Sequence, residues 1–241
     1  MKKTEIYNQL YSEGLSQEDR LKKVVKILKT LSSVENFLDI GCGDGSLTVF
    51  LAQILNVHDV KAVEIAEEGV DKAREKGIDC YKIDLDCDYL PFEDRAFDFV
   101  FCGEVIEHLF DPDHLIEEIY RVLKPGGRCI ITTPNLGAWH NRLLLLMGYQ
   151  PYLISVSLKH YGAGKFFEKS SSSGREHIRF FTLRALKSLL RTYNFKIESC
   201  VGAHTKPFYA PFPLSSLVLS LEKFFSNLPS LATSIIIEVV K

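Results

Sequence analysis

Short apolar runs alternate with amphipathic helical patterns along most of this 241-residue chain, and that alternation restricts the fold more than any other feature. Runs typical of buried or half-buried strands occur at Phe37–Ile40, Val60–Val63, Tyr81–Ile83, Phe97–Phe101, Cys129–Thr132, Phe195–Val201 and Ile235–Val240. Helical patterns between the first five occur at Leu47–Leu55, Glu67–Lys76 and Asp113–Leu123. Strands that alternate with helices are typical of a parallel sheet covered on both faces. We therefore predict an α/β fold whose ligands bind beyond the carboxyl ends of the strands.

We expect residues 1–241 to form one domain, because α/β sheets of this length often fold as a single unit. A first helix is predicted over 16–31, with Ser16 as its N-cap. Two segments, 134–178 and 203–232, interrupt the alternation. Both are too long for connectors and too rich in aromatic and aliphatic residues to be disordered. We predict that they are insertions that form a lid over the acceptor site.

Composition and charge narrow the class of protein. Hydrophobic residues make up 46% of the chain and charged residues 25%, which is the balance of an ordinary globular protein. The 29 Lys and Arg residues face 31 Asp and Glu residues, which disfavours a protein that binds nucleic acid mainly through charge. The six cysteines form no Cys-x-x-Cys pair, and neither a signal peptide nor an apolar stretch of ~20 residues is visible. We expect a soluble, cytoplasmic protein with reduced thiols.

A glycine-rich turn follows the first predicted strand, in the sequence LDIGCGDGSLT at 38–48. Its three glycines let the backbone turn tightly into a helix and approach a ligand closely. Glu64 ends the next strand, where an acidic side chain accepts hydrogen bonds from the ribose hydroxyls of a nucleoside. Alone, the first feature is also typical of a plain strand–helix turn and the second of a surface glutamate. Together they predict a site for a nucleoside-containing cofactor.

A second polar cluster follows the fourth predicted strand. Glu104, Glu107 and His108 stand at i, i+3 and i+4, and on a helix these positions share one face. Two carboxylates and an imidazole suit a divalent metal such as Mg²⁺, Mn²⁺ or Fe²⁺. The alternative is an acidic helix start with a packed histidine and no metal, and residue type alone favours this second interpretation.

The glycine-rich turn, the acidic residue after the second strand and the motifs that follow them along the chain resemble those of the class I S-adenosylmethionine (SAM)-dependent methyltransferases. The resemblance spans residues 34–135 and includes FDFVFCGEVIEHL at 97–109 and RVLKPGGRCIITTPN at 121–135. It implies a Rossmann-like, seven-stranded, mostly parallel sheet with a reversed final hairpin. It also implies that the methionine moiety of SAM lies along the glycine turn, that Glu64 binds the ribose, and that Asp84 faces the adenine. The implied contacts are Asp39, Gly41, Cys42, Gly43, Glu64, Ile65, Asp84, Leu85, Cys102 and Gly103.

The EVIEH string at 104–108 is similar to that of ubiquinone-pathway O-methyltransferases and of small-RNA terminal 2′-O-methyltransferases. In both groups the two glutamates and the histidine are associated with a divalent metal that orients the acceptor hydroxyl, and the RNA enzymes add a second histidine from a later segment. The resemblance therefore implies a metal site made by Glu104, Glu107, His108 and His177. Many methyltransferases with such a string have no reported metal, so a structural cluster stays open.

Catalytic groups are expected among the histidines, because imidazole titrates near neutral pH and accepts a proton from a hydroxyl. The candidates are His108 and His177, and the general base without a metal is His140 or His160. We expect O-methylation of a small-molecule or lipid-linked acceptor, with peripheral membrane contact through the apolar insertions. The alternatives are an RNA 2′-O-methyltransferase and a non-catalytic SAM-binding regulator. No motif specifies an oligomeric state.

Overall fold

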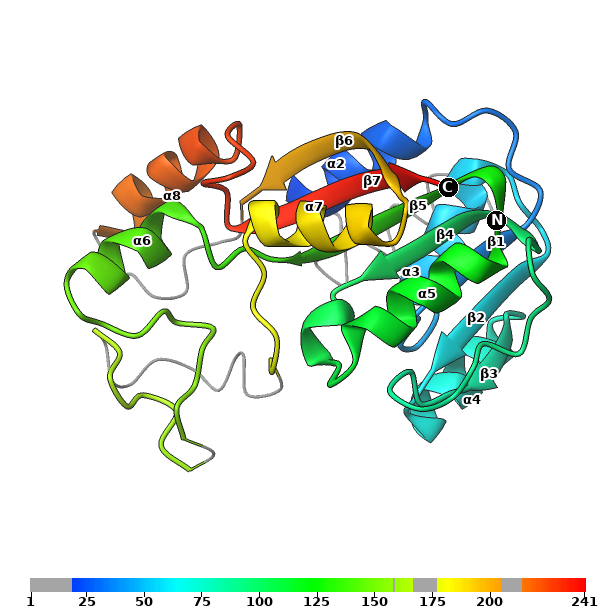
Figure 1. Ribbon diagram of the computed structural model, residues 1–241, viewed down its shortest axis with the longest axis horizontal. Helices are drawn as coiled ribbons and strands as arrows, with labels where there is room; N and C mark the ends of the chain where they lie inside the picture. The colour runs from blue at the N-terminus through cyan, green and yellow to red at the C-terminus, as the bar shows by residue number, and fades with distance from the viewer. Residues whose placement is uncertain (1–18, 158, 167–176, 205–213) are drawn as a thin grey trace.

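The computed structural model describes residues 19–157, 159–166, 177–204 and 214–241. Its centre is one seven-stranded sheet in the order β3-β2-β1-β4-β5-β7-β6 (Figure 1). The strands are β1 (Phe37–Ile40), β2 (Val60–Glu64), β3 (Asp79–Lys82), β4 (Phe97–Gly103), β5 (Leu123–Pro134), β6 (Lys196–Ala203) and β7 (Ser234–Val240). The helices are α2 (Asp19–Leu28), α3 (Ser46–Leu55), α4 (Glu67–Glu75), α5 (Pro112–Val122), α6 (Trp139–Leu146), α7 (Leu183–Thr192), α8 (Leu214–Phe225) and the short 3₁₀ helix η2 (Ile106–His108).

Strands β1 to β5 are parallel, and β1 lies between β2 and β4. The chain winds outward in one direction from β1 to β3 and in the other direction from β4 onward, so the carboxyl ends of β1, β2 and β4 meet where the winding reverses. The predicted parallel strands are confirmed, with small differences at their ends. The largest difference is in β5, which begins at Leu123 and not at Cys129, because Leu123 already pairs with Phe97 of β4.

The last two strands run against the rest of the sheet. β7 pairs with β5 in antiparallel fashion, with Ile237 opposite Ile131, and β6 forms the edge beyond it, with Val201 opposite Ile236. Because β7 has a neighbour on each side, it is buried along nearly its whole length. This reversed hairpin confirms the predicted Rossmann-like fold.

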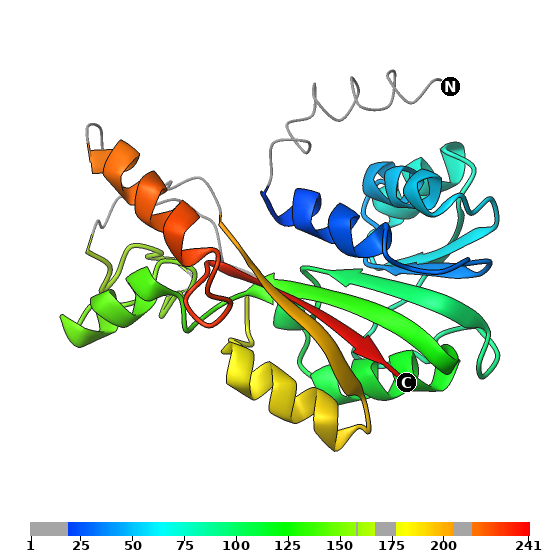
Figure 2. The ribbon, with the colours of Figure 1, turned by 90° about the horizontal axis from the view of Figure 1, so that it is seen from above.

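Hydrophobic cores lie on both faces of the sheet. Helices α2, α3 and α4 cover one face, and α5 and α7 cover the other (Figure 2). Successive side chains of a strand point to opposite faces. Phe99 and Phe101 of β4 therefore join the first core, whereas Val100 and Cys102 join the second. Because β4 is buried on both faces of the sheet, its sequence is apolar at nearly every position.

Helix α2 is shorter than the helix predicted over 16–31. It ends at Leu28, and residues 16–18 lie outside the described part of the chain. The Asp19 carboxylate accepts a hydrogen bond from the backbone N–H of His204 at 3.1 Å and pairs with Lys23 at 2.8 Å. The Lys23 ammonium in turn donates to the carbonyl of Gly202 at 2.7 Å. These contacts fix the start of α2 against the end of β6.

The two predicted insertions contribute helices α6 and α8, which pack together at one end of the sheet (Figures 1 and 2). The rings of Trp139 and Phe225 stack with centroids 5.4 Å apart, and Nδ1 of His140 lies 3.0 Å from Oε1 of Glu222. Residues 167–176 and 205–213, which the lid prediction also includes, lie outside the described residues. Segments distant in the sequence therefore form one structural unit beside the carboxyl end of β5.

All six cysteines are free, as predicted for reduced thiols. Four are buried, Cys87 is exposed and Cys200 is half-buried. Across the described ranges, no helix combines the length and the apolar character that crossing a membrane requires.

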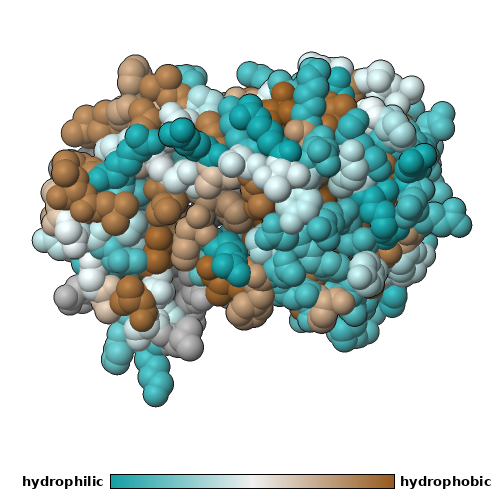
Figure 3. All heavy atoms as spheres, viewed as in Figure 1, coloured by the Kyte–Doolittle hydropathy of each residue, from teal (hydrophilic) through white to brown (hydrophobic). Residues whose placement is uncertain are grey.

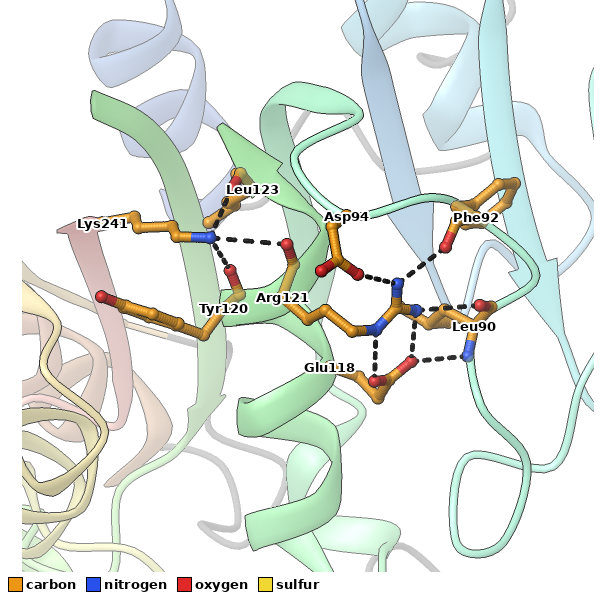
Figure 4. A network of polar contacts seen from close by, with 8 residues as sticks. All are labelled: Leu90, Phe92, Asp94, Glu118, Tyr120, Arg121, Leu123 and Lys241. Atoms are coloured by element: carbon orange, nitrogen blue, oxygen red, sulfur yellow. Dashed lines mark hydrogen bonds and ion pairs between the residues drawn. The ribbon is translucent and has the colours of Figure 1, made fainter. Parts of the chain in front are cut away.

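A polar network fastens the loop before β4 to helix α5 (Figure 4). The Arg121 guanidinium donates to the carbonyls of Phe92 and Leu90 at 2.8 and 3.0 Å and pairs with Asp94 at 2.9 Å. It also pairs with the Glu118 carboxylate, which accepts the backbone N–H of Leu90 at 2.8 Å. The planar guanidinium group of Arg121 thus holds this loop, which contains neither a strand nor a helix, against α5.

Replacing Arg121 should destabilise the protein, because Arg121→Met leaves the nearly buried Glu118 carboxylate without its partner. We expect the free energy of unfolding to fall by about 2 kcal/mol in urea denaturation. Lys82→Met is the matched control, because Lys82 pairs with Glu67 at 2.6 Å where both side chains are largely exposed. That change should cost less than ~1 kcal/mol. Equal losses in the two variants would contradict the role assigned to Arg121.

Candidate functional site

The glycine-rich turn after β1 requires glycine for two different reasons. Gly41, Gly43 and Gly45 all have positive φ, at 73°, 55° and 77°. A Cβ added at Gly41 would lie 2.3 Å from Cγ2 of Val105, so position 41 has no room for a side chain. A Cβ added at Gly43 would meet no atom within 4 Å. The turn therefore packs tightly at Gly41 and faces open space at Gly43, where a ligand can approach the backbone.

Asp39, one of the residues predicted to contact SAM, lies beneath this turn. Its side chain is buried and accepts a hydrogen bond from the hydroxyl of Thr48 in α3. Burial raises its pKa to about 7, because the charged form loses its hydration. The Asp39 side chain thus joins β1 to α3 and supports the turn from below.

Glu64 connects the turn to the end of β2. Its Oε2 accepts the backbone N–H of Gly43 at 2.9 Å, and its Oε1 accepts those of Ile65 and Ala66, both at 2.9 Å. Three backbone donors hold the carboxylate beside the open face of the turn. A carboxylate has about four acceptor positions, so this arrangement leaves one, on Oε2, for a hydroxyl of a ribose. Next to it, Ile65 is 59% exposed and offers an apolar surface.

The remaining predicted SAM contacts lie at the carboxyl ends of β3 and β4. Asp84 and Leu85 are half-buried after β3, where the Asp84 carboxylate accepts the backbone N–H of Asp86 at 3.1 Å. The Cys102 side chain is fully buried in the second core. A Cβ on Gly103 would lie 2.7 Å from the ring of Phe101. At the end of β4 only backbone atoms of residues 102–103 can therefore face a ligand.

The segment 104–108 is not the regular helix that the sequence analysis assumed. Glu104 has φ of 57°, in the left-handed region, and only the 3₁₀ turn Ile106–His108 follows it. The backbone N–H of Glu104 donates to the carbonyl of Thr132 at 2.9 Å, which extends the pairing of β4 with β5. This pairing holds Glu104 at the strand end and separates it from the turn that carries Glu107 and His108.

Three of the four predicted metal ligands nevertheless converge. Ligand atoms of Glu107, His108 and His177 all lie within 4.8 Å of one another. The carbonyl of Glu107 accepts the backbone N–H groups of both Ile178 and Arg179 at 2.9 Å, and this contact brings His177 to the site. The rings of His108 and His177 meet edge to face with centroids 4.8 Å apart. The end of the 134–178 insertion thus meets the turn after β4 at one carbonyl.

Glu104 does not join this cluster, which corrects the predicted set of four ligands. Its Oε2 lies 2.6 Å from Nη1 of Arg20 in α2, and its Oε1 accepts the hydroxyl of Thr132 at 2.9 Å. Arg20 was not among the predicted site residues, and its long-range pairing carries no signal in the sequence. The ion pair connects the N-terminal helix to the edge of the site.

The Glu107 carboxyl is the most unusual group of the site. Its residue is 2% exposed, its Oε2 accepts the hydroxyl of Thr133 at 2.9 Å, and its buried Oε1 has no hydrogen-bond partner within the described structure. Burial and the nearby charge of Glu104 raise its pKa to about 8. The carboxyl borders a small pocket that is lined by Asn135, Asn141, Pro151, Ile154 and His177.

The other predicted bases lie elsewhere. His140 is buried beside Glu222, whose second oxygen accepts the hydroxyl of Thr233. His160 is exposed in the loop after α6, where its backbone N–H donates to the hydroxyl of Ser157 at 3.0 Å. Neither lines the pocket at Glu107. Asn135 and Asn141 also line this pocket but were not among the predicted site residues; only Asn135 carries a sequence signal, since it directly follows β5.

Comparison with known proteins agrees with this geometry. Residues 38–131 match the family model described as "Methyltransferase domain". This part of the chain is therefore similar to a methyltransferase domain. A structure of a SAM-dependent methyltransferase from Thermotoga maritima, described as a possible histamine N-methyltransferase, covers 98% of this chain and 99% of its own, with a TM-score of 0.61 and 20% identity. That likeness shows the shared fold.

Three curated relatives are similar to part of the chain. A demethylmenaquinone methyltransferase of Listeria welshimeri is 30% identical over 158 residues, 62% of this chain and 63% of the relative. An uncharacterized methyltransferase of Schizosaccharomyces pombe is 35% identical over 113 residues, 42% of this chain and 40% of the relative. A ubiquinone biosynthesis O-methyltransferase of Xylella fastidiosa is 36% identical over 103 residues, 41% of each chain. The matches thus span 40% to 63% of the relatives' lengths.

The raised pKa of Glu107 predicts how stability depends on pH. The unfolded chain loses this proton near pH 4.5 and the folded chain only near pH 8, so this group lowers the free energy of unfolding as the pH rises between the two values. Glu107→Gln removes the effect. The variant should gain stability relative to the wild type from about pH 5 to about pH 9, by ~1.4 kcal/mol for each unit of pKa difference.

Urea denaturation of the two proteins at both pH values measures this change. Glu67→Gln is the control, because Glu67 is exposed at the start of α4 and pairs with Lys82. A stability difference between wild type and Glu107→Gln that stays constant with pH would contradict the raised pKa.

Proposed function

We propose that the chain is a SAM-dependent methyltransferase that methylates an oxygen atom of a small-molecule or lipid-linked acceptor. The observation that carries the proposal is the contact between two sites. The glycine turn and Glu64 form a cofactor cradle at the ends of β1 and β2, and Val105 joins that cradle to the Glu107–His108–His177 cluster. A curated ubiquinone biosynthesis O-methyltransferase among the relatives supports an oxygen acceptor with a lipid tail.

The residues of the cradle fit SAM. The open space at Gly43 accepts a ligand that the backbone must approach, and the Glu64 carboxylate keeps one acceptor position on Oε2 for a ribose hydroxyl. When bound, SAM supplies an electrophilic methyl group on a sulfonium. Since methyl transfer is an in-line displacement, the chain contributes mainly orientation and a dry site. The apolar pocket wall at Pro151 and Ile154 serves the second purpose.

Two kinds of group in the cluster could accept the proton of the acceptor hydroxyl. The Glu107 carboxyl, with a pKa of about 8, exchanges a proton near neutral pH. The imidazoles of His108 and His177 lie next to it. We assign the general-base role to this cluster and not to His140, because His140 faces Glu222 between α6 and α8.

The same cluster fits a divalent metal. One carboxylate and two imidazoles form a mixed O and N donor set that suits Mn²⁺ or Fe²⁺ better than Mg²⁺, which prefers oxygen. Oε1 of Glu107 is buried and has no hydrogen-bond partner in the described structure, so it is a free oxygen atom that could coordinate such an ion. A metal held there supplies positive charge that lowers the pKa of a chelated hydroxyl.

Methylation of a ribose 2′-hydroxyl at an RNA end is a second candidate function, and the position of His177 favours it. The small-RNA methyltransferases that the EVIEH string resembles use a second histidine from a later segment, and here His177 lies beside His108. The apolar wall of the pocket favours a small or lipid-linked acceptor instead. Turnover on a ribose 2′-hydroxyl but not on catechols would favour the RNA reaction.

Removing the Glu64 carboxylate should weaken SAM binding. Glu64→Ala loses a charge-assisted hydrogen bond to the ribose of about 1.5–3 kcal/mol, so we expect the dissociation constant to rise at least tenfold in a calorimetric titration. Glu67→Ala, an exposed glutamate three positions further on, should bind as the wild type does. Wild-type affinity of Glu64→Ala would refute the assignment of the cradle.

Replacing His177 should separate metal binding from cofactor binding. We expect His177→Ala to lose binding of Mn²⁺ in a metal titration, and to lose at least about a hundredfold in turnover if the metal orients the acceptor, while its SAM affinity stays unchanged. His58→Ala changes an exposed histidine between α3 and β2 and serves as the control. If the chelator-treated wild type keeps full activity and binds no Mn²⁺, the cluster acts as a proton acceptor alone.

A further inference from the structure

The end of the molecule made by α6 and α8 exposes apolar side chains. Leu146 on α6 is 85% exposed, and Phe224 and Leu217 on α8 are 64% and 57% exposed. The other exposed apolar residues of this end are Leu143, Leu145, Met147, Tyr149, Val156, Phe166 and Leu228. Figure 3 shows hydrophobic side chains gathered at this end, whereas the opposite end is mostly hydrophilic. We call this surface the apolar tip, and clusters of this kind mark interaction sites on soluble proteins.

Internal contacts hold the two helices of the tip together. Trp139 stacks on Phe225, and His140 lies 3.0 Å from Glu222. Nη2 of Arg142 donates to the carbonyl of Ser230 at 3.1 Å. These contacts occupy the facing sides of α6 and α8, so the exposed leucines belong to one preformed surface.

The tip and its neighbour α7 are basic, although the whole chain is not. The described residues of 134–166, 177–193 and 214–233 contain eight Lys or Arg and one acidic residue, Glu222. Glu222 is buried beside His140, and seven of the eight basic residues reach the surface, the buried one being Lys165. The full chain carries 29 basic and 31 acidic residues. Positive charge therefore predominates over negative charge on the tip and along α7.

A groove continues the positive surface from the tip along α7. Arg184, Lys187 and Arg191 follow one another at helical spacing and line this groove. Ser230, which joins α8 to β7 and accepts from Arg142, lies on its other side. The apolar residues of the tip and the basic residues of the groove thus adjoin each other.

We infer that this end of the protein docks on the surface of a lipid bilayer that contains anionic lipids. Exposed leucines and aromatic rings insert between acyl chains, while Lys and Arg attract the negative headgroups. RNA would use the basic groove and leave the apolar tip exposed to water. A second copy docking through the same end would bring like charges together. The combination of apolar and basic residues therefore favours the bilayer.

The docking surface lies beside the proposed acceptor pocket. Pro151 and Ile154 of the pocket wall belong to the loop that follows α6, and Asn141 belongs to α6 itself. A lipid-linked acceptor would then reach the pocket without leaving the bilayer. Docking is measured as binding, without methyl transfer, so this inference and the proposed function can fail separately.

Flotation with vesicles tests the inference directly. The full chain is mixed with vesicles of phosphatidylcholine alone, or of phosphatidylcholine with phosphatidylglycerol. We expect strong binding only to the anionic vesicles, with binding that weakens as salt is added. Leu146→Glu should reduce it about tenfold or more, and Arg184→Gln about fivefold. Tyr89→Glu and Lys196→Gln are the matched controls, because Tyr89 is 74% exposed and the Lys196 side chain 80% exposed, both away from the tip.

Three results would overturn the inference. The first is no flotation with either kind of vesicle, and the second is equal loss of binding in the tip variants and their controls. The third is a different occupant: single-stranded RNA that binds to the wild type but not to Arg184→Gln, or a dimer in sedimentation that Leu146→Glu dissociates, in each case without vesicle binding. Circular dichroism of each variant confirms that the fold is intact.

Discussion

The contact between Gly41 and Val105 is the constraint on which the rest of the site depends. Gly41 ends β1 in a left-handed conformation, and the methyl group of Val105 occupies the place of its missing side chain. Val105 stands between Glu104 and the 3₁₀ turn that carries Glu107. This contact therefore sets the separation between the cofactor cradle and the polar cluster. A methyl group moves only a short distance in the transfer, so the two parts must lie this close.

A second constraint is the single carbonyl of Glu107. It accepts two backbone N–H groups from the end of the first insertion, residues 178–179, so the chain that leads into α7 passes close to the cluster. The same residue thus places His177 with its main chain and presents a buried carboxyl with its side chain. Since backbone hydrogen bonds at this point depend little on residue type, the position of His177 is determined by chain path more than by local sequence.

The sequence predicts the elements that depend on local pattern. The strand–helix alternation, the glycine turn and the apolar run of β4 each follow from burial and backbone geometry. The pattern fails at 104–108, where helical spacing suggested a shared face. There, pairing of Glu104 with Thr132 extends the sheet and overrides the helical tendency. Arg20 and Glu104 lie far apart in the sequence, so only the folded chain reveals that the first helix neutralises one of the two glutamates.

The central claim is that the chain transfers a methyl group from SAM to an oxygen atom at the cluster beside the cradle. The most direct measurement is incubation with SAM that carries a ¹³C-labelled methyl group and a panel of catechols, amines and enolisable ketones, followed by carbon NMR of the products. The account predicts a labelled O-methyl carbon on a catechol. Label found only on nitrogen or carbon, or no consumption of SAM with any acceptor class, would contradict it.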